Sequence, residues 1–236
     1  MDVGWFLKER TKFIRQYHAV AITPFETIKS QIENGEAPYE PPYSEDGEPP
    51  FQVEWSDADT SVQVVGRACV TMLSESVKLY FQTWEELLSV KRQPALAAIF
   101  KKQGFAAGYK ECFRQQAELN WDECPADLSI IEQIVLARNI AAHHNGHLGS
   151  MSVRYPREVR EKLESPLFLH DYEKRALDED QKSVFTFLGS ELVVTKETLD
   201  EAVQHVELLV DWMEPKLQEI RWRPRRRGSK SGGGGG

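Results

Sequence analysis

The stretch SIIEQIVLARNIAAH, from Ser129 to His143, decides the fold class and contains the most unusual residue of the chain. Its apolar residues recur at offsets of three, four and seven, the spacing of one face of an α-helix. Ser129 and Glu132 form an S-x-x-E pattern that predicts a capping box, and Gly146 predicts a left-handed stop beyond the other end. We therefore predict an amphipathic helix that begins at Ser129 and ends near His144.

Arg138 lies on the face of this helix that Ile131 and Ile134 mark as buried. Removing an arginine from water costs several kcal/mol, so burial without an anionic partner is rare. We expect the guanidinium to be compensated by an anion, by a second subunit, or by an internal carboxylate such as Glu75 or Glu111.

Asn139 and His143 are four residues apart and therefore share one side of the helix. Arg138 and His143 are separated by five residues, which places them about 140° apart around the helix axis. One helix cannot easily direct both of these side chains at the same atom. Two copies packed about a two-fold axis can, so joint action of the pair predicts a homodimer.

The residues Arg138-Asn139-Ile140-Ala141-Ala142-His143 resemble the R-x-x-x-x-H motif of the HEPN-domain family, including the polar residue that often follows the arginine. The resemblance covers this motif, its place at the end of a helix, and the mostly helical context. It implies an antiparallel helical bundle that dimerises through the motif helices. It further implies a metal-independent endoribonuclease, often a toxin controlled by an antitoxin protein or an antiviral or stress effector. Other members have lost catalysis and bind RNA, a nucleotide or a partner protein.

The residue types of the motif suit RNA cleavage by the neighbouring 2′-hydroxyl. Arg138 would hold the phosphate bidentately and stabilise the charge that develops on its oxygens. His143 would act as general acid or base, because an imidazole titrates near neutral pH. Asn139 would orient the phosphate or the imidazole. The products would be a 2′,3′-cyclic phosphate and a 5′-hydroxyl, and the reaction requires no cofactor.

Other interpretations of these residues stay open. Arg138 can form an ion pair inside a purely structural dimer, and His143 at a helix C-terminus interacts favourably with the helix dipole whether or not it reacts. His143 and His147 have a metal-ligand spacing, but Gly146 breaks the helix between them, and no cysteine or carboxylate completes a zinc set. We therefore expect no metal, and we expect His144 and His147 to be loop residues that contact RNA.

Composition and charge set wider bounds. The 236 residues include 41% hydrophobic residues and six tryptophans, which predicts a folded core. No run approaches the ~20 apolar residues of a membrane span, and the start lacks the features of a secretory signal. Cys69, Cys112 and Cys124 are odd in number and widely spaced, which favours reduced thiols that fill a core and a cytoplasmic protein.

The net charge of −8 opposes binding of a polyanion at long range. Acidic residues crowd positions 33–59, whereas the segment from Arg221 to Lys230 is basic without an acid. This tail could recruit RNA or fold onto the acidic loop, although a solvated tail is the favoured interpretation. Phosphate-binding loops, nucleophile elbows and paired C-x-x-C motifs are lacking, so no other catalytic pattern competes.

The remaining pattern predicts an all-α antiparallel bundle in a single domain, residues 1–220, followed by a basic and glycine-rich tail, residues 221–236. Pro24 is expected to break or kink a helix that starts at residue 2, and residues 34–55 form an acidic, proline-rich loop. A small β-hairpin is expected near residues 184–194. The other expected helices span residues 56–90, 94–101, 105–119, 156–163 and 195–220, the last capped by Thr195.

Overall fold

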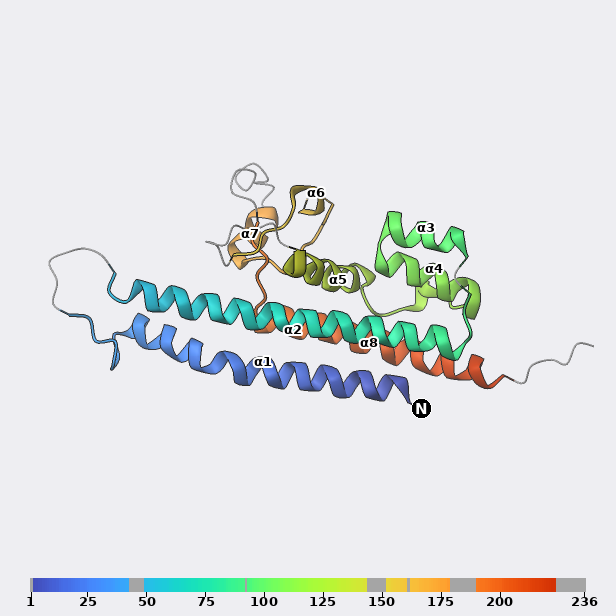
Figure 1. The fold of residues 1–236 in the computed structure, drawn as a ribbon, viewed down its shortest axis with the longest axis horizontal. Coiled ribbons are helices and arrows are strands. Elements are labelled where there is room, and N and C mark those ends of the chain that lie inside the picture. The colour runs from blue at the N-terminus through green and yellow to red at the C-terminus, as the bar shows by residue number, and fades with distance from the viewer. Residues whose placement is uncertain are drawn as a thin grey trace, which may run out of the picture.

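A long helix, α2 (Gln52–Leu87), runs through the centre of the molecule and packs against α1 (Val3–Asn34), α5 (Leu128–His143) and α8 (Lys196–Trp222). α1 and α2 form a long antiparallel pair, with α8 packed along both and α5 on the far side of α2 from α1 (Figure 1). The computed structural model describes residues 2–42, 49–91, 93–143, 152–160, 162–178 and 190–223.

The predicted all-α class is confirmed over these residues. Their only β pairing is an isolated antiparallel bridge between Arg154 and Glu191. None of their helices is both long enough and apolar enough to cross a bilayer. The shorter elements are α3 (Pro94–Gln103), α4 (Phe105–Ala117), the 3₁₀ turn η1 (Trp121–Glu123), α6 (Arg157–Arg160) and α7 (Asp171–Asp178), of which η1 and α7 were not predicted.

The core forms where the apolar stripe of α2 meets α1, α5 and α8. Leu73, Phe81 and Trp84 of α2 are at most 1% exposed, and each large apolar side chain so buried stabilises the fold by about 1.5–3 kcal/mol. Cys69 and Cys112 are buried in this core as free thiols, as predicted, and Cys124 is half-buried.

The sequence predicts a break or a kink at Pro24; the break is wrong, because α1 continues through the proline as one helix. Proline removes one backbone donor and crowds the carbonyl one turn earlier, a local cost. Tertiary contact outweighs this cost, since α2 packs along α1 and Lys29, beyond the proline, pairs with Asp59 of α2 at 2.8 Å.

α2 begins at Gln52, inside the loop predicted over residues 34–55. The indole nitrogen of Trp55 donates to Glu33 at 2.8 Å, and the ammonium of Lys29 lies 4.9 Å from the Trp55 ring centre. These contacts with the end of α1 fix the first turn of α2, so the proline-rich segment is shorter than its composition indicates.

The predicted capping box at Ser129 and Glu132 is wrong, although the helix itself is present. Asp127 provides the cap, because its carboxylate accepts from the amide of Ser129 at 2.7 Å. Glu132 instead accepts from the amide of Ala106 at 2.7 Å and so caps α4. Gly104, with a φ of 103°, lets the chain pass so close that a Cβ there would meet the Glu132 carboxylate. By contrast, the predicted cap of α8 by Thr195 is present.

Residues 152–155, 165–169 and 190–194 form an irregular lobe against α5. The buried amide of Gln133 holds it there, donating to the carbonyl of Ser165 at 3.1 Å and accepting from the amide of Leu167 at 2.7 Å. Within the lobe, Leu192 donates to the carbonyl of Val153 at 2.7 Å. Most of the predicted hairpin near 184–194 lies outside the described residues, and its last residues pair with this other segment instead.

Glu132 makes the stability of the α4–α5 contact dependent on pH. Burial raises its pKa above the ordinary value of 4.5, although the backbone amides of Ala106 and Phe105 act in the opposite direction. Its contribution to the free energy of unfolding is therefore complete below pH 4.5 and is lost as the pH rises through the raised pKa. The stability of the wild type relative to Glu132→Gln should fall as the pH rises from about 4 to about 7.

Urea denaturation at several pH values measures this difference, with Glu86→Gln, at an exposed position of α2, as the matched control. A difference between wild type and Glu132→Gln that stays constant or increases with pH would contradict the assignment.

Candidate functional site

A groove of about 380 Å³ lies between α2 and the C-terminal half of α5. Most of its surface is apolar, and small side chains line much of it. The groove is lined by Val64, Arg67, Ala68 and Thr71 of α2, by Ala141 and Ala142 of α5, and by Val153.

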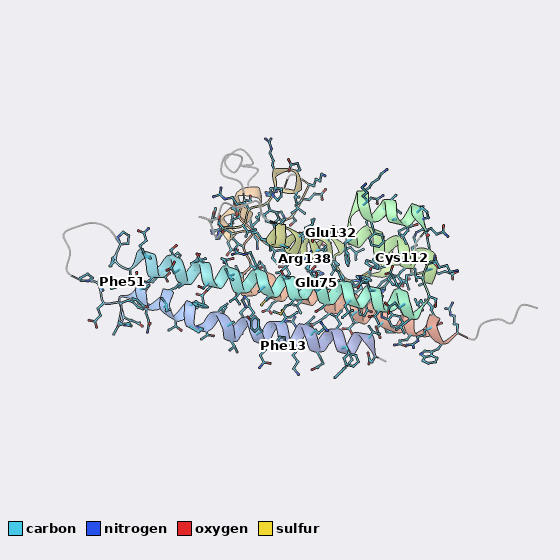
Figure 2. The ribbon with its side chains drawn as sticks, in the orientation of Figure 1. Phe13, Phe51, Glu75, Cys112, Glu132 and Arg138 are labelled. Atoms are coloured by element: carbon cyan, nitrogen blue, oxygen red, sulfur yellow. The ribbon has the colours of Figure 1, made fainter. Side chains whose placement is uncertain are left out.

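Arg138 and Glu75 face each other across the two helices, one turn beyond the groove (Figure 2). Thr71 precedes Glu75 by one turn of α2, and Ala142 follows Arg138 by one turn of α5, so the pair continues the groove. Arg138 Nε lies 3.0 Å from Glu75 Oε1, and Arg138 Nη1 donates to Asn139 Oδ1 at 3.1 Å. The Nε–H does not point at a hydrogen-bond acceptor, so its contact with Glu75 is an ion pair without a hydrogen bond.

Glu75 shares its charge between two cations. The same oxygen, Oε1, also accepts from the ammonium of Lys78 at 3.2 Å. Of the two carboxylates that the sequence offered as partners for Arg138, Glu75 is therefore the one in contact. Glu111 instead binds Arg114 at 2.6 Å on the surface of α4.

Arg138 is not as buried as its position on the helix predicted. Its side chain is 30% exposed, whereas Ile131 and Ile134 on the same face are fully buried. The difference arises because Arg138 lies near the end of α5, where the long side chain reaches the edge of α2. A carboxylate within the same chain pairs with the charge, so no second subunit is needed to neutralise it.

The side chains of the three candidate histidines, His143, His144 and His147, lie outside the described part of the chain. α5 extends through His143, so the angular separation from Arg138 holds for the backbone, but the His143 side chain lies outside the described residues. His144 and His147 also fall outside them. The structure thus brings together Arg138 and Asn139 and adds Glu75.

Arg67 is a residue of the groove that sequence reasoning missed. It is 8% exposed and lines the groove between the two helices. Burial lowers the pKa of Arg67 below its ordinary value, and the charge of Glu191 acts in the opposite direction; an arginine side chain nevertheless stays protonated at neutral pH. The sequence does contain a pattern that places Arg67 and Glu75 on the same side of α2. A spacing of four residues puts Arg67, Thr71 and Glu75 on one face of the helix.

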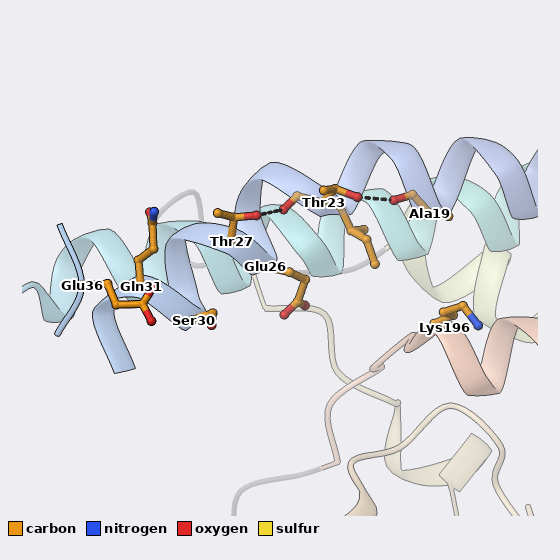
Figure 3. Close-up of a pocket in the computed structure, with 9 residues that line it drawn as sticks. Ala19, Thr23, Glu26, Thr27, Ser30, Gln31, Glu36 and Lys196 are labelled. Atoms are coloured by element: carbon orange, nitrogen blue, oxygen red, sulfur yellow. Dashed lines mark hydrogen bonds between the residues drawn. The ribbon is translucent and has the colours of Figure 1, made fainter. Parts of the chain in front are cut away.

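A second, shallower hollow lies on α1 beside the start of α8 (Figure 3). Its charged residues are Glu26, Glu36 and Lys196, so its lining is net negative. Thr23 and Thr27 direct their hydroxyls to backbone carbonyls of α1, at 2.7 and 2.8 Å, rather than into the hollow (Figure 3). This surface does not suit a ligand that carries phosphate.

Two other kinds of site, a metal centre and a reactive thiol, were compared with the part of the chain that the structure describes. No group of three histidine, cysteine or acidic side chains there is arranged to hold a metal ion. Burial raises the pKa of the Cys69 thiol to about 11, which keeps it protonated and unreactive.

Comparison with protein-family models, with curated proteins and with solved structures found no match. The function must therefore be inferred from the residues of the site.

The exposure of the Arg138–Glu75 pair predicts that it contributes little to stability. Exposed ion pairs are worth about 0–1 kcal/mol, so Arg138→Ala should lower the free energy of unfolding by less than about 1 kcal/mol. Urea denaturation measures this loss, with Arg114→Ala as the control on α4. A loss of about 3 kcal/mol or more would instead identify Arg138 as one half of a structural buried pair.

Proposed function

We propose that this chain is a metal-independent endoribonuclease of the HEPN type, in which Arg138 binds the phosphate at the cleaved bond and His143 transfers protons. One observation carries the proposal. The guanidinium of Arg138 lies one turn beyond the α2–α5 groove, in contact with Asn139 and Glu75. A cation held in place before its ligand arrives stabilises a developing anion without reorganisation.

Glu75 acts in this proposal as the anion that holds Arg138 until RNA binds. An RNA phosphate is a stronger bidentate partner for arginine than a carboxylate that makes one misaligned contact. Lys78 lies 3.2 Å from the same oxygen of Glu75, so the carboxylate keeps a cationic partner when the phosphate replaces it at Arg138. Release of Arg138 therefore leaves no unpaired charge.

The reaction needs two proton transfers. A base removes the proton of the 2′-hydroxyl, whose oxygen attacks the adjacent phosphorus, and an acid protonates the departing 5′-oxygen. His143 is the proposed acid or base, and as the last residue of α5 it gains from the negative end of the helix dipole when protonated. The products are a 2′,3′-cyclic phosphate and a 5′-hydroxyl.

A second chain would contribute to this site only through the last turn of α5. Of residues 128–142, only Ser129 and Ala142 are exposed rather than buried or half-buried, because α2, α4, α8 and the lobe cover the helix. A dimer of motif helices would thus join Arg138, Asn139 and Ala142 to the same turn of its partner. A toxin or defence role, an antitoxin partner and a cytoplasmic location belong to the same proposal and follow from the resemblance alone.

A binding module without catalysis is the second candidate. The apolar walls of the groove, formed in part by Ala68, Ala141 and Ala142, fit a flat nucleobase, and Arg67 lies beside them. The same surface would then hold RNA or a nucleotide without cutting it.

Incubation of the protein with a 5′-labelled RNA of mixed sequence in excess chelator tests the proposal. The wild type should cleave the RNA to cyclic-phosphate ends. Loss of a phosphate-binding donor typically costs about 10²–10³ in rate, and loss of a general acid or base about 10²–10⁴. Arg138→Ala and His143→Ala should therefore each lower the rate at least about 100-fold.

Arg114→Ala, a surface arginine on α4, is the matched control and should cleave like the wild type. Cleavage that requires magnesium, leaves 5′-phosphate ends or survives Arg138→Ala would refute the nuclease mechanism. RNA that is bound but left intact by the wild type would support the second candidate.

A further inference from the structure

α1 lies at the edge of the molecule away from α5 (Figure 1). Several of its large apolar side chains are exposed. We call four of them the outer stripe: Phe6, Phe13, Tyr17 and Val20, which are 52%, 58%, 41% and 67% exposed. Their offsets of seven, four and three place them on one side of the helix. The rings of Phe13 and Tyr17 stack with centroids 6.1 Å apart.

The outer stripe takes no part in the core. The buried face of α1 is formed by other residues, among them Leu7, Ile14 and His18, and Phe13 projects from the edge of the molecule (Figure 2). Aromatic side chains bury about 150–250 Å² each, so the half-exposed stripe presents about 400 Å² of apolar surface. A patch of this size is comparable to the largest that a typical monomer exposes, and such patches are often functional.

We propose that the outer stripe binds a second copy of this chain, with the two α1 helices antiparallel and a two-fold axis beside Phe13. Phe6 and Val20 each lie seven residues from Phe13, so the axis sets Phe13 against its counterpart and Phe6 against the valine of the other copy. The repeat of seven is the spacing of a seam between two helices. The contact would be about 21 Å long.

The area and the shape of the surface support a second copy as the occupant. Two stripes together bury about 800 Å², and their flanking side chains raise this to about 1,200 Å², the lower end for a specific interface. A mostly apolar hollow of about 260 Å³ lies beside Phe6, between Arg10 of α1 and Leu79 of α2. The antiparallel arrangement brings Val20 of the other copy to this hollow.

Charges along the stripe agree with the same arrangement. A two-fold axis at position 13 sets Arg10 against positions 16 and 17, which are Gln16 and Tyr17. Glu9 likewise meets position 17. No like charges oppose each other, and an arginine over a tyrosine ring is a favourable pair.

This interface is independent of the proposed nuclease site. α1 and α5 lie on different sides of α2, so a contact through α1 leaves the α2–α5 groove open (Figure 1).

Sedimentation or light scattering over a concentration series tests the proposal on the full chain. The wild type should form a dimer, and Phe13→Glu, which sets two carboxylates against each other on the axis, should weaken it at least about 100-fold. Val53→Glu changes a valine that is 71% exposed but lies on α2, outside the stripe, and should leave the dimer intact. A wild type that stays monomeric up to about 100 µM, or an association state that Phe13→Glu leaves unchanged, overturns the proposal.

Cross-linking fixes the orientation and does not depend on the Phe13→Glu variant. With a short thiol-reactive linker, Phe13→Cys should form a homodimer, and a mixture of Phe6→Cys and Val20→Cys a heterodimer. Val20→Cys alone should not react, since its two copies lie about 21 Å apart. Efficient cross-linking of Val20→Cys to itself, or none of Phe13→Cys beyond the wild-type background, would overturn the antiparallel contact.

Discussion

The burial of α5 against α2 is the contact on which the rest of the structure depends. Most of the surface of α5 is covered, because α2, α4, α8 and the irregular lobe each pack against part of it. Ile131 and Ile134 are fully buried, Glu132 caps α4, and Gln133 holds the lobe. A helix covered in this way can reach solvent only at its ends, and Arg138 lies at the end that borders the groove.

That placement decides how Arg138 can act. A fully buried arginine needs a permanent counter-ion, whereas one at the rim of a groove can exchange partners. The Glu75 carboxylate makes one poorly aligned contact and has Lys78 as a second cation. An arginine held in this way is compensated in the free protein and remains accessible to a phosphate.

The sequence predicts features that neighbouring residues determine. The apolar period places α2, α5 and α8, and Thr195 caps α8 because its partner, Thr198, is three residues away. Prediction from the sequence fails where the interacting residue is remote along the chain. Glu132 fits a local capping box, yet its acceptor atoms serve Ala106, twenty-six residues earlier in the chain. The prediction at Pro24 fails for the same reason. Locally a proline favours the end of a helix, but the contact between α1 and α2 outweighs this preference.

The candidate site was accessible to sequence reasoning only in part. Arg138 stands out as a charge in an apolar helix, and Glu75 was one of the carboxylates that could compensate it. Choosing between Glu75 and Glu111 requires the crossing of α2 and α5, which no local pattern encodes. Arg67 was missed because it sits beside the apolar stripe of α2 and lines a groove that only the packed helices create.

The affinity for a 2′-O-methyl RNA, which lacks the attacking hydroxyl and so cannot be cleaved by this route, tests the central claim most directly. If Arg138 binds a phosphate, Arg138→Ala should weaken this affinity about tenfold, a loss of about 1.4 kcal/mol. It should also reduce the slope of log affinity against log salt by about 0.7, the value for one phosphate contact with a single strand. Equal affinity and equal salt dependence for the wild type and the variant would contradict the account.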